Sequence, residues 1–395
     1  MGDTPRQSII GFGGAFTESS ASVYASLPRS SKNAVLDLLF GKDGLNYSLG
    51  RLTIGSSDFS LREYDYSSKD DLSDFSLSHD KKEIIPFLKN VFDRRPLTLL
   101  ASSWSPLAKW KTNNNKCGGG HLLPECYDIY SSYIQKYVEG YKALNLPISA
   151  LTIQNEPEAV QSWESCIFSP DEERKLLLFL HNKMPDIHLY IHDHNRDRML
   201  ERSKEILSTA EALEATTGIA YHWYDRDSYK EVEKTKEAFT NKNIIFTEGC
   251  IETLQKDYKG PKSFASALRY AKNYCLGLEY GTSAFIDWNL LLDEIGGPNH
   301  VGNFCESPIM RENKNILVNP SYFAIKHFSY FIKPGARSVK VKIDKSPKAL
   351  FATGVINPDN SKIIILVNEG EEAIITLPLG PSLVIPPSSI ATIVL

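Results

Sequence analysis

The chain has 395 residues, of which 42% are hydrophobic and 23% are charged, an ordinary composition for a globular protein. This length predicts two or three domains, or one large barrel with an appended domain. The formal net charge of -4 offers no basic footprint, so neither nucleic acid nor an anionic membrane surface is an expected partner.

The sequence as written shows neither a secretory signal nor a membrane span. Residues Met1 to Ser8 lack the apolar core of a signal peptide, and no stretch approaches the roughly 18 uninterrupted apolar residues of a span. We therefore expect a cytoplasmic protein, or a secreted one whose signal peptide has been removed, with no obligatory membrane contact. The sequence does not indicate an oligomeric state.

Short β runs alternate with longer helical stretches from residue 9 onward. Eight such runs are predicted, at residues 9–15, 47–54, 97–102, 148–154, 187–193, 219–223, 243–247 and 283–288. Repeated βα units predict a parallel sheet, and eight of them fit an α/β fold of the closed (β/α)8 TIM-barrel type. An open doubly wound sheet is the alternative, but the glycines from Gly11 to Gly14 lack the G-x-G-x-x-G spacing, so no dinucleotide cofactor is expected.

Two further regions follow the eighth run. Residues 289–319 contain the turn sequence Gly296-Gly297-Pro298-Asn299, and a segment of this length is typical of a lid or binding loop. Beyond Pro334-Gly335, short β runs at 338–343, 349–356, 362–367, 373–377 and 389–395 predict a small antiparallel β-sandwich side domain or half-barrel. We expect a catalytic barrel over residues 1–334 and a β domain, residues 335–395, packed on it.

The cysteines and histidines give no firm metal or disulfide pattern. Cys117 and Cys126 flank a glycine-rich loop and would pair only in an oxidising compartment. No CxxC occurs, so a structural zinc site is not expected. Strand alternation would put His188, His192 and His194 on one face, but a polar strand end explains them better than a metal. We therefore expect no cofactor and no metal.

Two glutamates follow predicted strands at the end where TIM barrels carry their catalytic groups. Glu156 stands in Gln154-Asn155-Glu156-Pro157, and Glu248 in Thr247-Glu248-Gly249-Cys250. Hydrolysis of a glycosidic bond needs such a pair, since a protonated carboxyl protonates the leaving oxygen and an ionised one attacks the anomeric carbon. A separation of roughly 5–5.5 Å would give retention of configuration, and a wider gap would give inversion.

Other strand ends supply groups that suit this chemistry. Arg51 is placed to keep Glu248 ionised, because a nearby cation lowers the pKa of a carboxyl. Asn155 is placed to bind the 2-hydroxyl of the sugar, a contact that strengthens in the transition state. Trp104 and Trp288 would stack against the sugar ring.

Several motifs, read together and in order from residue 10 to residue 334, resemble the glucosylceramidases of glycoside hydrolase family 30. They are Gly11-Phe12-Gly13-Gly14-Ala15-Phe16-Thr17-Glu18, Asp58-Phe59-Ser60, Asn155-Glu156-Pro157, His222-Trp223-Tyr224, Thr247-Glu248-Gly249-Cys250, Asp287-Trp288-Asn289, and the stretch from Gly296 through Asn303 to Pro308.

This resemblance implies a (β/α)8 barrel with a β side domain and a retaining mechanism. Glu156 falls on the acid/base position and Glu248 on the nucleophile position. The positions that bind the sugar or line the site are occupied by Asp58, Trp104, Asn155, His222, Tyr224, Trp288 and Asn303. The expected partner is a carbohydrate or glycoside.

The implied reaction is hydrolysis of a β-glucoside of the glucosylceramidase kind. The alternatives are an endo-β-1,6-glucanase or a β-xylosidase or β-fucosidase of the same family, and, from a different class, a non-catalytic carbohydrate-binding barrel. Residues 158–168, which border the leaving-group side, diverge from the family pattern, so the sequence leaves the aglycone open.

Overall fold

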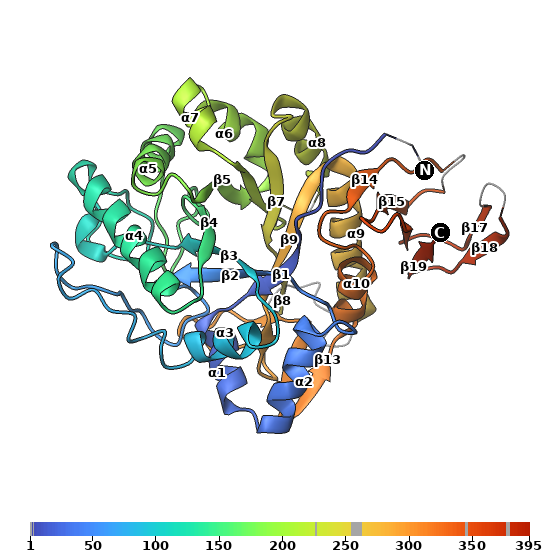
Figure 1. Ribbon diagram of the computed structural model, residues 1–395, viewed down its shortest axis with the longest axis horizontal. Coiled ribbons are helices and arrows are strands. Elements are labelled where there is room, and N and C mark those ends of the chain that lie inside the picture. The colour runs from blue at the N-terminus through green and yellow to red at the C-terminus, as the bar shows by residue number, and fades with distance from the viewer. Residues whose placement is uncertain (1, 3, 226, 254–262, 344–346, 377–379) are drawn as a thin grey trace.

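The computed structural model describes residues 2, 4–225, 227–253, 263–343, 347–376 and 380–395. Its centre is a closed barrel of eight parallel strands (Figure 1), which confirms the predicted TIM barrel. The strands, in order around the barrel, are β1 (Gly11–Ala15), β2 (Leu49–Ile54), β3 (Thr98–Ser103), β4 (Ile148–Thr152), β5 (His188–Asn195), β6 (Gly218–His222), β7 (Asn243–Glu248) and β9 (Thr282–Asn289).

The barrel interior is layered. One apolar layer consists of Leu49, Leu100, Ala150, Tyr190, Ala220, Ile245, Ala284 and Ile286. Successive side chains alternate along a strand, so the residues two positions further along β2, β3, β4 and β7 also point inward. Those residues are Arg51, Ser102, Thr152 and Thr247, all buried. A polar layer therefore lies on the apolar one, toward the carboxyl ends of the strands.

Helices surround the barrel. They are α1 (Glu18–Ser26), α2 (Arg29–Phe40), α3 (Ile84–Phe92), α4 (Tyr127–Ala143), α5 (Pro170–Lys183), α6 (Met199–Ile206), α7 (Ala210–Ala215), α8 (Tyr229–Ala238), α9 (Phe264–Tyr280) and α10 (Pro320–Ser329). The start of helix α5 can be traced to its sequence, because Ser169 and Glu172 form a capping box around Pro170 at the first helical position. Among the described residues, no helix combines the length and apolarity needed to cross a bilayer.

The predicted long loop after β9 contains secondary structure of its own. Strands β10 (Leu291–Leu292), β12 (Ile309–Glu312) and β13 (Asn315–Val318) form a small sheet, and β11 (Cys305–Glu306) pairs with β8 (Ile251–Glu252). Strands of two to four residues are too short for a hydrophobic period to show in the sequence. This pairing ties the segment to the residues that follow β7.

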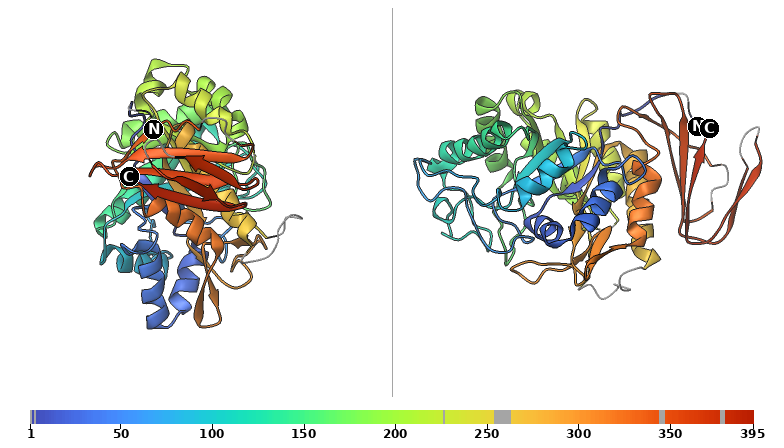
Figure 2. Two further views of the ribbon diagram at one scale, coloured as in Figure 1. Left: turned by 90° about the vertical axis from the view of Figure 1, so that its right-hand side faces the viewer. Right: turned by 60° about the horizontal axis from the view of Figure 1, so that its bottom comes forward.

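The C-terminal region is antiparallel, as predicted. Strands β14 (Arg337–Val339), β15 (Leu350–Ile356), β16 (Lys362–Asn368) and β19 (Ser389–Val394) form one sheet, and β17 (Ala373–Thr376) pairs with β18 (Ser382–Ile385). Figure 2 shows the larger sheet lying beside the barrel, against α9 and α10.

Three details of this region differ from the sequence prediction or lie outside what the structure describes. The strand expected at 338–343 ends at Val339, and β18 was not predicted. Residue 377, the end of another predicted run, lies outside the described residues. The N-terminal residues join the sheet edge, because the amide of Arg6 donates to the carbonyl of Ser338 and Ser8 pairs with Arg337.

Candidate active site

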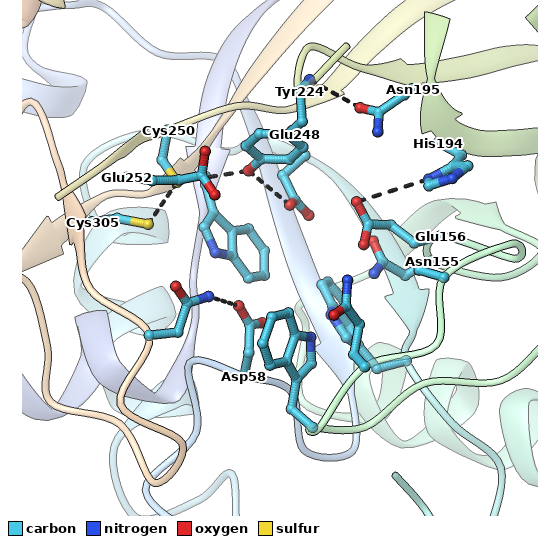
Figure 3. Close-up of a pocket in the computed structure, with 16 residues that line it drawn as sticks. Asp58, Asn155, Glu156, His194, Asn195, Tyr224, Glu248, Cys250, Glu252 and Cys305 are labelled. Atoms are coloured by element: carbon cyan, nitrogen blue, oxygen red, sulfur yellow. Dashed lines mark hydrogen bonds and ion pairs between the residues drawn. The ribbon is translucent and has the colours of Figure 1, made fainter. Parts of the chain in front are cut away.

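A cavity of about 200 Å³ opens at the carboxyl ends of the barrel strands. Eight of the residues singled out from the sequence line it: Asp58, Trp104, Asn155, Glu156, Tyr224, Glu248, Trp288 and Asn303. Arg51 and His222 are fully buried and contact Glu248 and Glu156 from behind. Figure 3 shows Glu156 and Glu248 pointing into the same space, with Asp58 across from them.

Glu156 is held in an unusual backbone conformation just after β4. Its φ is 46°, in the left-handed region that non-glycine residues rarely occupy, and its amide donates to the carbonyl of Asp193. Its Oε1 lies 3.2 Å from His222 Nδ1 and 3.8 Å from His194 Nδ1. Burial raises the pKa of Glu156, but the hydrogen bond and charge of His222, with the charge of His194, outweigh it and leave the pKa below its ordinary value.

Glu248 is the last residue of β7 and is held by two donors. Arg51 Nη1 donates to its Oε2 over 2.7 Å, and the Tyr224 hydroxyl donates to its Oε1 over 3.0 Å. Burial raises the pKa of Glu248, and the charges of His222 and Arg51 oppose that rise without cancelling it. Carboxylate oxygens of Glu156 and Glu248 lie within 4.8 Å of each other and of a His222 ring nitrogen.

Arg51 uses each nitrogen of its side chain to organise the floor of the cavity. Nε donates to Ser102 Oγ over 3.0 Å, and Nη2 donates to Asn155 Oδ1 and Asp193 Oδ2, both over 2.9 Å. Because Arg51 engages Oδ1 of Asn155, the amide nitrogen of Asn155 is the group left for a ligand. A planar guanidinium with a fixed fork of donors suits this task.

His222 lies between two carboxylates. Its Nε2 is 3.1 Å from Asp193 Oδ1, and its Nδ1 faces Glu156. Carboxylates accept hydrogen bonds, so both ring nitrogens carry hydrogen in this arrangement. Burial alone would lower the pKa of His222, but Glu248, Asp193 and Glu156 raise it to about 9.

Asp193 is a central residue that the sequence analysis did not select as a site residue. Besides Arg51 and His222, its carboxylate accepts from Thr152 Oγ1 and Thr247 Oγ1, each over 2.5 Å. Burial raises its pKa, and Arg51 and these hydrogen bonds bring the pKa well below its ordinary value. A β-bulge puts Asp193 here: the register of β5 against β6 shifts at this point, and His192 and Asp193 have φ of 75° and 43°.

The bulge also overturns the expected alternation of the three histidines. His192 is fully buried and bonds to the carbonyl of Asn195, whereas His194 faces the cavity next to Glu156. His188 is exposed at the other end of β5, near Thr217. The three rings therefore do not share one face.

The remaining walls combine aromatic and polar groups. Trp104 and Trp288 are stacked with ring centroids 5.1 Å apart, and each is 2% exposed. Asn303 Nδ2 donates to Asp58 Oδ2 over 2.8 Å. Burial, with the charge of Glu248 adding to it, raises the pKa of Asp58 well above its ordinary value.

Residues that the sequence analysis did not select as site residues complete the cavity. They are Ala159, Gln161, Trp163, His194, Asn195, Cys250, Glu252 and Cys305. The sulfurs of Cys250 and Cys305 are 2.7 Å apart. Cys117 and Cys126, the pair considered for a disulfide, are both free thiols. Cys250 follows Glu248 by two residues and could have been found on that ground, whereas Cys305 lies on β11, far from Glu248 in the sequence.

An eight-stranded parallel barrel with two adjacent carboxylates in a small polar cavity at its mouth is the construction of a glycoside hydrolase. The chain matches the Glycosyl hydrolase family 30 TIM-barrel domain over residues 9–332 and the Glycosyl hydrolase family 30 beta sandwich domain over residues 335–393. The chain belongs to glycosyl hydrolase family 30, as its motifs indicated, and its substrates are carbohydrates.

The relatives point to two kinds of activity within this family. The lysosomal acid glucosylceramidase of Mus musculus is 29% identical over 93% of this chain and 76% of its own length. SrfJ from Salmonella typhimurium has a TM-score of 0.94 and 32% identity, covering 99% of this chain and 90% of that one. The endo-beta1,6-glucanase BT3312 has a TM-score of 0.90 and 26% identity, and the match covers 99% of this chain and 92% of that one.

Proposed function

We propose that the protein is a retaining β-glycosidase that hydrolyses β-glucosidic bonds, with Glu156 as acid/base and Glu248 as nucleophile. One observation carries the proposal: carboxylate oxygens of these residues lie within 4.8 Å of each other. Retaining glycosidases place their carboxyl groups roughly 5–5.5 Å apart, whereas inverting ones leave roughly 6.5–9.5 Å for a water molecule.

In the first step, ionised Glu248 attacks the anomeric carbon. The bond from that carbon to the leaving oxygen breaks, and Glu156 gives its proton to that oxygen. The hydrogen bonds from Arg51 and Tyr224 fix the Glu248 carboxylate before the substrate arrives, which reduces the reorganisation that the reaction requires. The product of this step is a glycosyl ester on Glu248.

In the second step, water enters on the side that the leaving group has vacated. Glu156, now ionised, takes a proton from the water as its oxygen attacks the anomeric carbon, and the ester bond to Glu248 breaks. Two displacements at one carbon restore the original configuration. Glu156 thus acts once as an acid and once as a base.

His222 supplies the proton that this scheme requires at Glu156. The pKa of Glu156 is lowered and that of His222 is raised to about 9, so at neutral pH the proton belongs to the imidazole. His222 Nδ1 and Glu156 Oε1 are 3.2 Å apart, a hydrogen bond along which the proton can move. As the leaving oxygen gains negative charge, the proton is drawn through Glu156 onto it. The proton that Glu156 takes from water in the second step then returns to His222, which restores the starting state.

The cavity favours a single sugar ring in the glycone site. About 200 Å³ is less than the roughly 300–1,000 Å³ of pockets that enclose drug-sized ligands. The stacked Trp104 and Trp288 offer an aromatic wall, the Asn155 amide nitrogen faces the 2-hydroxyl, and Asp58 with Asn303 binds hydroxyls across the ring. A glycone site of this size favours removal of terminal sugar residues.

The second candidate is an endo-β-1,6-glucanase, which the similarity to the endo-beta1,6-glucanase BT3312 favours. The two candidates differ in where the chain of the substrate must go. A glucanase needs room for several sugars on both sides of the scissile bond, whereas a terminal glucosidase needs room for one sugar on the glycone side and for the leaving group on the other.

A substrate panel with stereochemical readout tests the proposal. Aryl β-glucosides, β-xylosides and β-fucosides, glucosylceramide and β-1,6-linked glucans are incubated with the enzyme, and the first product is followed by proton NMR. We expect turnover of aryl β-glucoside with β-glucose appearing first. Initial α-glucose would refute the retaining mechanism, and turnover of the glucan alone would select the second candidate.

A further inference from the structure

A second group of ligand-type side chains lies at the mouth of the barrel, outside the catalytic cavity. Glu63, Glu164 and His300 each offer one ligand atom within 4.8 Å of the other two. They come from the segments that follow β2, β4 and β9. The segment after β3 adds Cys117, whose Sγ is 3.2 Å from Glu63 Oε1.

Glu164 is the residue that most needs a partner. It is 1% exposed, and neither of its carboxylate oxygens has a hydrogen-bond partner among the described residues. A buried carboxylate is costly unless a counter-charge, a hydrogen-bond donor or a metal satisfies it. The ammonium groups of the neighbouring Lys111 and Lys116 donate elsewhere, to the carbonyl of Ser165 and to Asp65 respectively.

His300 is oriented as a metal-binding histidine is. Its Nδ1 lies 2.9 Å from the carbonyl of Ser60, which can only accept, so Nδ1 carries the hydrogen. With Nδ1 so engaged, Nε2 is the ring nitrogen that faces Glu164, 3.5 Å from Oε1, and it has no hydrogen-bond partner in the described part of the chain. In a neutral ring, its lone pair is available to an ion at this point. Histidine ligands commonly donate their second ring nitrogen to a backbone carbonyl in this way.

The separation of the two atoms also suits a shared ion. Two ligand atoms of a tetrahedral zinc ion lie ~3.4 Å apart when each bond is ~2.1 Å. Nε2 of His300 and Oε1 of Glu164 are 3.5 Å apart. Two atoms that both carry lone pairs repel each other at this distance unless a cation or a proton lies between them.

The backbone arranges these residues without help from the ion. Cys117 and Glu164 form an antiparallel β-bridge, supported by hydrogen bonds from Gly118 to Gln161 and from Ser165 to Lys116. The next turn needs three consecutive glycines, because residues 118, 119 and 120 have φ of 71°, 69° and 74°.

We propose that Glu63, Glu164 and His300 bind one divalent transition-metal ion, zinc in the first place, and that the Cys117 thiol, 3.2 Å from Glu63 Oε1, joins them as a fourth ligand when the ion binds. One imidazole, two carboxylates and a thiol suit zinc, whereas calcium and magnesium take oxygen ligands. The absence of CxxC argued against structural zinc, but these ligands are far apart in the sequence and only the fold brings them together.

The ion would hold in place the loops that border the leaving-group side of the catalytic cavity. Gln161 and Trp163 line the catalytic cavity beside Glu164, and Asn303 lines it three residues after His300. Binding would therefore join four barrel loops at one point and set the positions of these side chains. This proposal is independent of which glycoside is hydrolysed.

Metal binding to the full-length protein tests the site directly. Protein stripped with a chelator and dialysed is titrated with Zn²⁺ by calorimetry and with Co²⁺ by absorption spectroscopy, and its Tm is recorded with each ion and with Ca²⁺. We expect one Zn²⁺ per chain, a rise in Tm, and cobalt bands of a four-coordinate site with a thiolate charge-transfer band. Absence of stoichiometric binding, or stabilisation by Ca²⁺ in place of Zn²⁺, would overturn the proposal.

Variants locate the ion. Glu164→Gln and His300→Gln should weaken Zn²⁺ binding by at least roughly tenfold, the lower end of what loss of even an indirect metal contact costs. Glu63→Gln repeats the test at an exposed position where folding is not at risk, and Cys117→Ser should remove the charge-transfer band and weaken Zn²⁺ binding. The exposed Glu125→Gln is the matched control and should bind as the parent does. Parent-like affinity in Glu63→Gln and His300→Gln would refute the site.

Discussion

The charge state of His222 makes the stability of the protein depend on pH in a way that can be calculated. The ordinary pKa of 6.5 applies to the unfolded chain, and in the folded protein the carboxylates around the ring raise it to about 9. A raised pKa stabilises the fold fully below the unfolded value, and the stabilisation is lost as pH rises through the folded value. At 1.36 kcal/mol per unit, the shift is worth ~3 kcal/mol.

His222→Gln removes this contribution while keeping a donor that can reach Asp193. The quantity to compare is the free energy of unfolding of the parent minus that of the variant. We expect this difference to be ~3 kcal/mol larger at about pH 6 than at about pH 10. Urea unfolding of both proteins at each pH measures this, and the subtraction cancels groups that titrate alike in the two. A parent-to-variant difference that is the same at both pH values would show that folding does not raise the pKa of His222.

Three further substitutions test the catalytic arrangement. Glu248→Gly should lose turnover, and azide should restore it with a product of inverted configuration; a rescued product of unchanged configuration would remove Glu248 from the nucleophile role. Glu156→Gln should slow alkyl glycosides by roughly 10²–10⁴-fold, the usual worth of a general acid, and dinitrophenyl glycosides far less; equal slowing would contradict the acid role. Arg51→Met should lower the free energy of unfolding by about 3–5 kcal/mol, because Asp193 and Glu248 lose their buried counter-charge. If urea unfolding shows no measurable decrease in this free energy, Arg51 is not needed to stabilise the two buried carboxylates.

The barrel could be predicted from the sequence because its signals are local. Each strand is recognisable as a short apolar run, and the residues at the carboxyl end of that run are the ones that reach the mouth of the barrel. Glu156 and Glu248 were found on that ground, and the structure brings their carboxylates together. Alternation along β2 likewise puts Arg51 in the interior, directly above Leu49.

The parts that escaped prediction depend on contacts between distant segments. Asp193 reaches the polar layer only because β5 bulges, and strict alternation hides such a shift. Cys305 comes to the cavity through the pairing of β11 with β8, two strands of two residues each. Glu63, Glu164 and His300 come from three separate loops, so no spacing of ligand-type residues within a single segment indicates that they form a group.

The hydrogen-bonded residues beneath the cavity have a consequence for what the enzyme should accept. Arg51 and protonated His222 face three carboxylates, those of Asp193, Glu156 and Glu248, so the group carries one surplus negative charge. A fixed negative charge in a water-poor site attracts the positive charge that an oxocarbenium-like transition state develops. The same field should draw in protonated imino sugars and repel uronic acids, so that the site selects its ligands by charge as well as by shape.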